Sequence, residues 1–148
     1  MIAPRINEQT LRFISLGLDP KEQELLKHLS SEIPCELQIA QDDLDLWSHA
    51  RYGSFDVCIL GQSEEIPDPS YLVWLLKGIA GESQIILIYS TLNKEEAERL
   101  ERFDAAFVLK RPVKPDQLTH TIDSALNGKG VRKVGFWSKL SGLLAHRS

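Results

Sequence analysis

The sequence predicts an α/β fold in three layers: a doubly wound, parallel (βα)5 sheet, followed by a C-terminal amphipathic helix. Three observations support this prediction. Five strand–helix units follow one another at spacings of about 20 to 25 residues, which is long enough for crossovers between parallel strands. Residues 55–60 and 84–89 are nearly continuous apolar runs, as in strands buried on both faces. Capping residues, glycines and prolines separate the strands from the helices.

Composition and length fit a single globular domain with a sizeable core, because 43% of the 148 residues are apolar and 26% are charged. No apolar run approaches the roughly 20 residues of a membrane-spanning helix, and the first ten residues lack the signal-peptide pattern. Cys35 and Cys58 form no CxxC pair. We therefore expect a cytoplasmic protein with two free thiols, buried or half-buried.

Charge is distributed unevenly along the chain. Residues 127–148 contain five basic and no acidic residues, so the net charge of -4 leaves -9 on residues 1–126. An acidic body argues against nucleic-acid binding by the domain. Two targets remain open for the basic segment: a charged partner and a membrane surface.

The first strand is predicted at residues 11–18, where apolar residues predominate. Asp19 suits an N-cap and Pro20 the first helical position, and Glu22 adds an acidic residue to the first turn. This pattern predicts a helix that extends to about residue 31.

The second strand is predicted at residues 35–40, where apolar and polar residues alternate. Asp42 and Asp43 follow, and we favour capping and helix-dipole roles for them over a metal cluster with Asp45. Gly53 ends the helix that they begin. Four residues of this helix are expected to face the core: Leu44, Leu46, Trp47 and Ala50.

The third strand, residues 55–60, is followed by an acidic loop with two prolines. Ser70 is expected to cap the next helix, whose core residues are predicted to be Leu72, Leu75, Leu76 and Ile79. After the strand at residues 84–89, a highly charged helix over residues 94–103 carries few apolar groups, which predicts exposure on most of its circumference.

The fifth strand is predicted at residues 105–110, and Pro115 opens the last helix of the domain. The inward residues of that helix are predicted to be Leu118, Ile122, Ala125 and Leu126. Three segments result: an N-terminal lead-in at residues 1–10, a domain at residues 11–128, and a basic amphipathic tail at residues 129–148.

The tail carries large apolar residues at helical spacing on one face: Phe136, Trp137, Leu140, Leu143 and Leu144. Such a stripe has to be buried somewhere. Three arrangements compete: packing on the domain, binding to a partner or a second copy, and peripheral contact with an anionic membrane surface.

Residues 11–128 resemble the CheY-like receiver domain of bacterial two-component response regulators. The resemblance rests on the order of strands and helices and on three motifs: Leu18-Asp19-Pro20 leading into the first helix, Phe55-Asp56 entering the third strand, and Arg111-Pro112-Val113-Lys114-Pro115-Asp116-Gln117-Leu118 after the fifth. It implies a flavodoxin/CheY-like sheet with the strand order 2-1-3-4-5.

The resemblance also places the family's phosphorylation site on this sequence. The phosphoacceptor aspartate falls on Gly61, and the acidic positions after the first strand read Gly17, Leu18 and Asp19. The strand-four Thr or Ser falls on Tyr89 or, with a shift of one residue, on Ser90.

The family's strand-five lysine falls on Arg111, because Lys110 would match only if a residue were inserted before Pro112. Two arrangements of Arg111 are open: pairing with Asp19 across the empty pocket, and extension into solvent. The family has a cis peptide at this place, and cis X-Pro bonds are rare in general, about 5%.

The altered positions point to a degenerate pseudo-receiver. Gly61 offers no nucleophilic oxygen for phosphoryl transfer, and Asp19 alone cannot hold Mg²⁺, which needs several oxygen ligands. We therefore expect no enzyme activity, no metal and no cofactor.

The resemblance implies a protein–protein interaction face, predicted at Glu95, Glu98, Arg99, Arg102, Lys110, Gln117 and His120. The alternative is that a charged helix is simply a solvated face. Our main hypothesis is a phosphorylation-independent signalling adaptor that binds another signalling protein or a second copy of itself. The alternatives are a regulatory input domain of a larger protein, such as a transcription regulator or a second-messenger enzyme, and a flavodoxin-like small-ligand binder.

Overall fold

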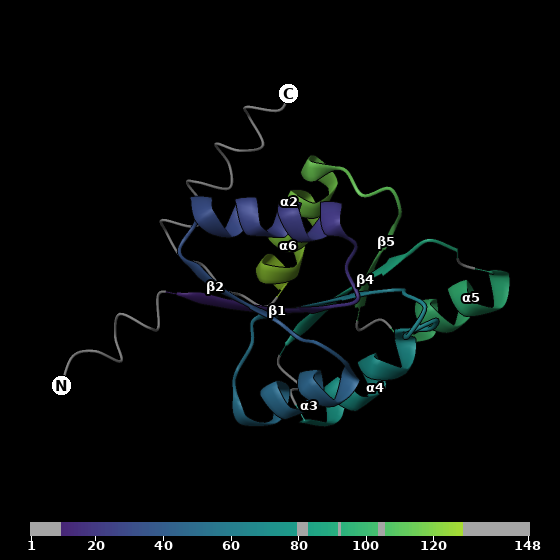
Figure 1. Cartoon of the computed structure of the whole chain (residues 1–148). Helices are drawn as coiled ribbons and strands as arrows, with labels where there is room; N and C mark the ends of the chain where they lie inside the picture. Colours follow the sequence, from purple (N-terminus) through teal and green to yellow (C-terminus); the bar gives the residue numbers. More distant parts are fainter. Residues whose placement is uncertain (1–9, 80–82, 92, 104–105, 129–148) are drawn as a thin grey trace.

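A five-stranded parallel sheet in the order β2-β1-β3-β4-β5 forms the middle layer of the molecule, as predicted (Figure 1). The structure is a computed structural model that describes residues 10–79, 83–91, 93–103 and 106–128. Residues 1–9 of the predicted lead-in lie outside these ranges. The predicted tail stripe also lies outside them: Phe136, Trp137, Leu140, Leu143 and Leu144.

The elements follow the predicted strand–helix alternation. The strands are β1 (Leu11–Leu16), β2 (Cys35–Ile39), β3 (Val57–Gly61), β4 (Gln84–Tyr89) and β5 (Ala106–Lys110). The helices are α2 (Pro20–Glu32), α3 (Asp43–Tyr52), α4 (Ser70–Ile79), α5 (Lys94–Phe103) and α6 (Pro115–Gly128). Helices α2 and α6 cover one face of the sheet, and α3, α4 and α5 cover the other (Figure 1).

Two apolar cores fill the spaces between the layers. Every residue of β3 is buried, because this strand lies at the centre of the sheet with a helix layer on each face. The inward residues predicted for α6 are all buried: Leu118, Ile122, Ala125 and Leu126. No helix in the described part of the chain is long and apolar enough to span a bilayer.

Two predictions for the helices on the second face were wrong. Leu44, predicted to face the core, is 70% exposed, whereas Leu46 and Ala50 on the same helix are buried. The buried residues of α3 lie four apart, on one narrow stripe, and Leu44 falls outside it. Ser70 is the first residue of α4 and not its cap, and its hydroxyl donates to the Asp68 carboxylate at 2.7 Å.

Both cysteines are free thiols, Cys58 buried and Cys35 half-buried. Burial, and to a lesser extent the charge of Glu36, raises the pKa of Cys35 to about 11. The thiolate is the reactive form, so a raised pKa keeps Cys35 protonated and unreactive well above neutral pH.

We therefore expect neither thiol to react readily with a disulfide reagent at about pH 8 in the folded chain, and both to react after unfolding in urea. The reactivity of Cys35 should rise as the pH approaches its pKa. The absorbance of the reagent measures the labelling, and rapid labelling of one thiol in the folded chain would contradict this expectation.

Candidate functional site

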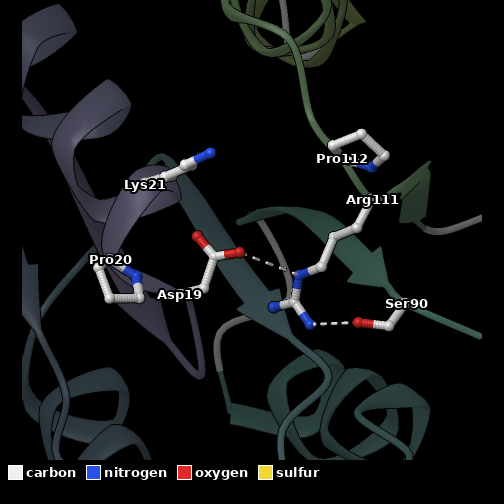
Figure 2. Close-up of a pocket in the computed structure, with 6 residues that line it drawn as sticks. All are labelled: Asp19, Pro20, Lys21, Ser90, Arg111 and Pro112. Atoms are coloured by element: carbon white, nitrogen blue, oxygen red, sulfur yellow. Dashed lines mark hydrogen bonds and ion pairs between the residues drawn. The ribbon is translucent and has the colours of Figure 1, made fainter.

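The carboxyl ends of the strands form a shallow pocket that is lined by Asp19, Pro20, Lys21, Ser90, Arg111 and Pro112 (Figure 2). This is the edge of an open α/β sheet where ligands and chemistry usually gather. Asp19 and Pro20 come from the start of α2, Ser90 from the end of β4, and Arg111 from the end of β5. The peptide bond between Arg111 and Pro112 is cis.

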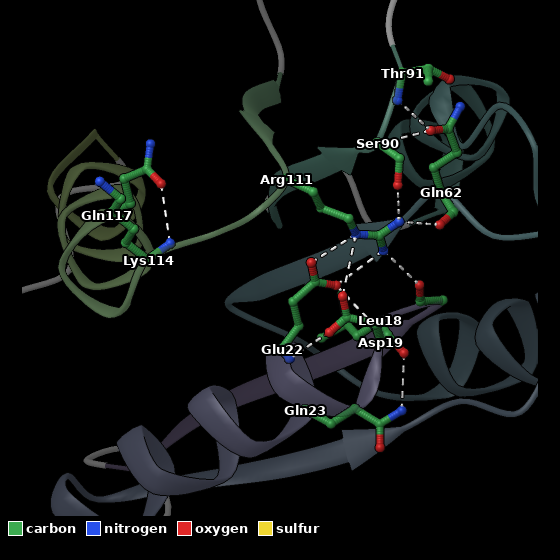
Figure 3. Close-up of polar contacts among 11 residues, drawn as sticks. Leu18, Asp19, Glu22, Gln23, Gln62, Ser90, Thr91, Arg111, Lys114 and Gln117 are labelled. Atoms are coloured by element: carbon green, nitrogen blue, oxygen red, sulfur yellow. Dashed lines mark hydrogen bonds and ion pairs between the residues drawn. The ribbon is translucent and has the colours of Figure 1, made fainter.

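Arg111 fills the centre of this edge (Figure 3). Its Nε donates to Glu22 Oε2 at 2.7 Å, and Nη2 donates to Glu22 Oε1 at 3.0 Å and to the Gly17 carbonyl at 3.2 Å. Its Nη1 donates to the Gln62 carbonyl at 2.6 Å and to the Ser90 hydroxyl at 2.9 Å. These five hydrogen bonds use all five N–H donors of the guanidinium.

The ion pair between Arg111 and Glu22 is shielded from solvent. The side chain of Glu22 is 3% exposed and that of Arg111 15% exposed. The two parallel contacts form the bidentate fork that guanidinium and carboxylate groups prefer. Breaking one partner of such a buried pair leaves an uncompensated charge, so each side chain fixes the position of the other.

Local sequence places Glu22 at this site. Asp19 caps α2, its carboxylate accepting from the Glu22 backbone N–H at 2.8 Å, and Glu22 Oε1 accepts from the Asp19 N–H at 3.0 Å. This reciprocal capping box directs the Glu22 side chain back over the helix N-terminus. The same carboxylate then receives Arg111 from the fifth strand.

Asp19 is a secondary partner of Arg111. Its Oδ2 lies 3.9 Å from Arg111 Nε, so the predicted pairing of Arg111 with Asp19 is present but long. The predicted alternative, an arginine extended into solvent, is wrong because the guanidinium is largely buried. The main carboxylate at the site is that of Glu22, which the sequence placed only in the first turn of the helix.

Gly17 and Gly61 let the ends of β1 and β3 approach each other closely. Gly17 has a φ of +79°, a conformation that favours glycine. A Cβ added at Gly61 would lie 2.4 Å from the Gly17 carbonyl oxygen and 2.8 Å from Arg111 Nη2. Position 61, where the resemblance puts the phosphoacceptor, therefore has no room for any side chain unless the backbone moves.

Gln62 ties the loops after β3 and β4 together. Its side-chain carbonyl accepts from the backbone N–H groups of Ser90 and Thr91 at 2.9 and 3.0 Å. Its amide nitrogen donates to the Pro67 carbonyl at 2.8 Å. The loop that carries Ser90 is thus held both by Gln62 and by Arg111 (Figure 3).

Of the two alternatives for the strand-four position, Ser90 is the one that lines the pocket. The Tyr89 side chain is buried in the core on the α3, α4 and α5 face of the sheet. Its hydroxyl donates to Asp68 at 3.1 Å. Leu18 is also buried, in the core on the opposite face, so neither side chain supplies a polar group to the pocket.

The residues at this edge do not fit the Mg²⁺ ion that the resemblance implies. A divalent ion needs carboxylate oxygens that are free to coordinate it. Both oxygens of Glu22 accept hydrogen bonds from Arg111, and Asp19 Oδ1 accepts from the helix N-terminus. Within the described ranges, no group of three or more His, Cys, Asp or Glu side chains could hold a metal ion.

The predicted interaction face is formed by β5, the edge strand of the sheet, and by the helices on either side of it. Its described members are exposed: Glu95, Glu98, Lys110, Gln117 and His120. The side chains of Arg99 and Arg102 lie outside the described part. Helices α5 and α6 flank β5 on opposite faces of the sheet, so these residues border one continuous edge (Figure 1).

Comparisons with known proteins find similarity in structure but not in sequence. No protein-family model matches the chain, and no curated protein matches it. Among solved structures, a CheY-like response regulator receiver domain protein from Methanospirillum hungatei JF-1 aligns with a TM-score of 0.72 at 14% identity, covering 82% of this chain and 97% of that one.

Two further neighbours carry the same fold. The signal receiver domain of an HD domain-containing protein from Pseudomonas fluorescens Pf-5 aligns with a TM-score of 0.68 at 15% identity, over 82% of this chain and 98% of that one. An adenylate cyclase structure from Rhodopirellula baltica aligns with a TM-score of 0.67 at 13% identity, over 81% and 90%. At these identities the likeness shows the fold: the chain has the fold of CheY-like receiver domains.

Proposed function

We propose that this chain is a pseudo-receiver: a non-catalytic signalling adaptor that binds a protein partner without being phosphorylated. The observation that carries the proposal is the buried Arg111–Glu22 pair, with Gly61 packed beneath it. Phosphoryl transfer to a receiver needs a nucleophilic oxygen and a metal site. In this chain the Arg111 guanidinium lies where a side chain at position 61 would point, and it binds both carboxylate oxygens of Glu22.

The same contacts link the carboxyl ends of four strands to one another. Arg111 joins the ends of β1, β3, β4 and β5, and Gln62 fixes the loop that carries Ser90. A switch needs two arrangements of comparable free energy that a ligand or modification can bias. This network stabilises one of them without a phosphoryl group, which supports constitutive binding of a partner.

The partner surface that we propose is the exposed edge formed by α5, β5 and α6. Lys110 and His120 contribute exposed polar side chains from β5 and α6. Another signalling protein or a second copy of this chain would dock there. We propose a cytoplasmic location for this function.

Affinity capture with the full chain tests this proposal. We expect the same partner to be recovered with and without acetyl phosphate and Mg²⁺, and to be lost when Lys110 and His120 are both changed to glutamate. A Lys27→Glu variant, changed on the outer side of α2, is the matched control and should retain the partner. Capture that requires the phosphodonor would contradict the proposal.

A second candidate function is a regulatory input domain of a larger protein. Two structural neighbours favour it: a receiver domain of an HD domain-containing protein and an adenylate cyclase. In that case residues 129–148 would connect the domain to an effector. A reading frame that continues beyond Ser148 into an effector domain would decide for this candidate.

A further inference from the structure

Exposed apolar side chains lie on α3 and α4, two of the helices that cover the face of the sheet opposite α2 and α6 (Figure 1). Leu44 is 70% exposed, Tyr71 50% and Trp74 76%. Tyr71 and Trp74 lie three residues apart on one face of α4. The Tyr71 hydroxyl donates to Asp43, the residue before Leu44, at 3.3 Å, so the first turns of the two helices lie side by side.

This apolar face, which we define by Leu44, Tyr71 and Trp74, is bordered by acidic residues only on the side of the helix N-termini. Residues 41–50 and 62–76 contain no Lys or Arg, and the basic residues that follow them, Arg51 and Lys77, lie in the last turns of α3 and α4, at the opposite end of the face. The two ranges contain six acidic residues: Asp42, Asp43, Asp45, Glu64, Glu65 and Asp68. Isolated exposed apolar residues are normal, but large aromatic ones beside an acidic helix end suit an amphipathic occupant with basic residues at the matching end.

The chain contains such a segment. Residues 129–148 carry five basic and no acidic residues, and their apolar residues recur at helical spacing: Phe136, Trp137, Leu140, Leu143 and Leu144. The segment therefore complements the apolar face in both charge and hydrophobicity.

The position where the described chain ends allows this contact. Helices of a (βα)5 fold run antiparallel to the strands, so α3, α4 and α6 all end at the sheet edge where the strands begin. Residues 129–135 span up to roughly 23–25 Å when extended. The distance from the α6 layer to the α3–α4 layer is about two helix diameters, roughly 20–24 Å.

We propose that the basic segment 129–148 docks on the apolar face of α3 and α4 of its own chain. Its apolar stripe would cover Leu44, Tyr71 and Trp74, and its later basic residues, Lys139 and Arg147, would approach the acidic helix N-termini. This surface lies away from the edge formed by α5, β5 and α6, so the docking does not depend on the proposed function.

Hydrogen exchange of the full chain, followed by mass spectrometry, tests the proposal. Amides of residues 136–144 should exchange about tenfold or more slowly than in a random coil, and Trp74→Glu should return them to the random-coil rate. Val108→Glu is the matched control, because Val108 is also an exposed apolar residue, 39% exposed, but lies on β5. It should leave the protection unchanged, and circular dichroism checks that both variants fold.

Four results would overturn the proposal. The first is random-coil exchange of residues 136–144 in the unchanged chain. The second is protection that Trp74→Glu does not alter, which would place the segment elsewhere. The third is protection only at concentrations where sedimentation shows a dimer, which would place the segment on a second copy. The fourth is protection only when vesicles of anionic lipid are added, which would identify a membrane surface as its target.

Discussion

Replacing Arg111 with methionine should lower the free energy of unfolding by about 3–5 kcal/mol, because it leaves the carboxylate of Glu22 buried and unpaired. The backbone carbonyls of Gly17 and Gln62 and the hydroxyl of Ser90 lose a donor at the same time. The loss exceeds that expected for a typical surface substitution, which is about 0.5 kcal/mol. Equilibrium unfolding in urea measures it.

Two variants make this test specific. Lys110→Met changes the neighbouring exposed residue and should alter the stability by no more than about 0.5 kcal/mol. Adding Glu22→Gln to Arg111→Met removes the unpaired charge and should recover part of the loss, since a neutral amide costs less to bury than a carboxylate. Equal stability of the Arg111 and Lys110 variants would show that the ion pair does not hold the site together.

Replacing Gly61 and Gly78 with alanine should have effects of opposite sign. A Cβ at Gly61 meets the Gly17 carbonyl at 2.4 Å, and crowding of this kind costs about 1–3 kcal/mol. A Cβ at Gly78 meets no described atom within 4 Å on an exposed part of α4, where alanine stabilises a helix by up to about 1 kcal/mol. Urea unfolding of the two variants measures both effects.

The same crowding determines the effect of placing an acceptor aspartate at position 61. Gly61→Asp should destabilise the fold at least as much as Gly61→Ala, and the chain should still accept no phosphoryl group. The new aspartate side chain would have to displace Arg111 or the Gly17 backbone before a phosphodonor could reach its carboxylate. If Gly61→Ala were as stable as the unchanged chain, the close packing of Gly17 and Gly61 would be wrong.

The sheet could be predicted because strands that are buried on both faces are nearly continuous apolar runs in the sequence. Strand β4 begins and ends at the predicted residues, and every residue of β3 is buried. The N-cap role of Asp19 was also predictable, since capping depends on residues within one helical turn. Leu44 was predicted wrongly because apolar spacing within a short helix does not distinguish the core stripe from an exposed apolar residue.

The site could be predicted only in part. The position of Gly61 follows from its place at the end of a buried strand. The partner of Arg111 does not, because Glu22 lies 89 residues away in sequence and the fold alone brings the two together. The capping box was a local signal that Glu22 turns back over the helix N-terminus, but it does not say which side chain arrives from the other strands.

Intact-mass spectrometry after incubation with acetyl phosphate and Mg²⁺ tests the central claim most directly. We expect the mass of the chain to remain unchanged, because Gly61 has no nucleophile and Arg111 uses the carboxylate of Glu22. A receiver domain with an intact acceptor aspartate, treated in parallel, should gain one phosphoryl group. A stoichiometric, acid-labile phosphoryl group on this chain would contradict the account.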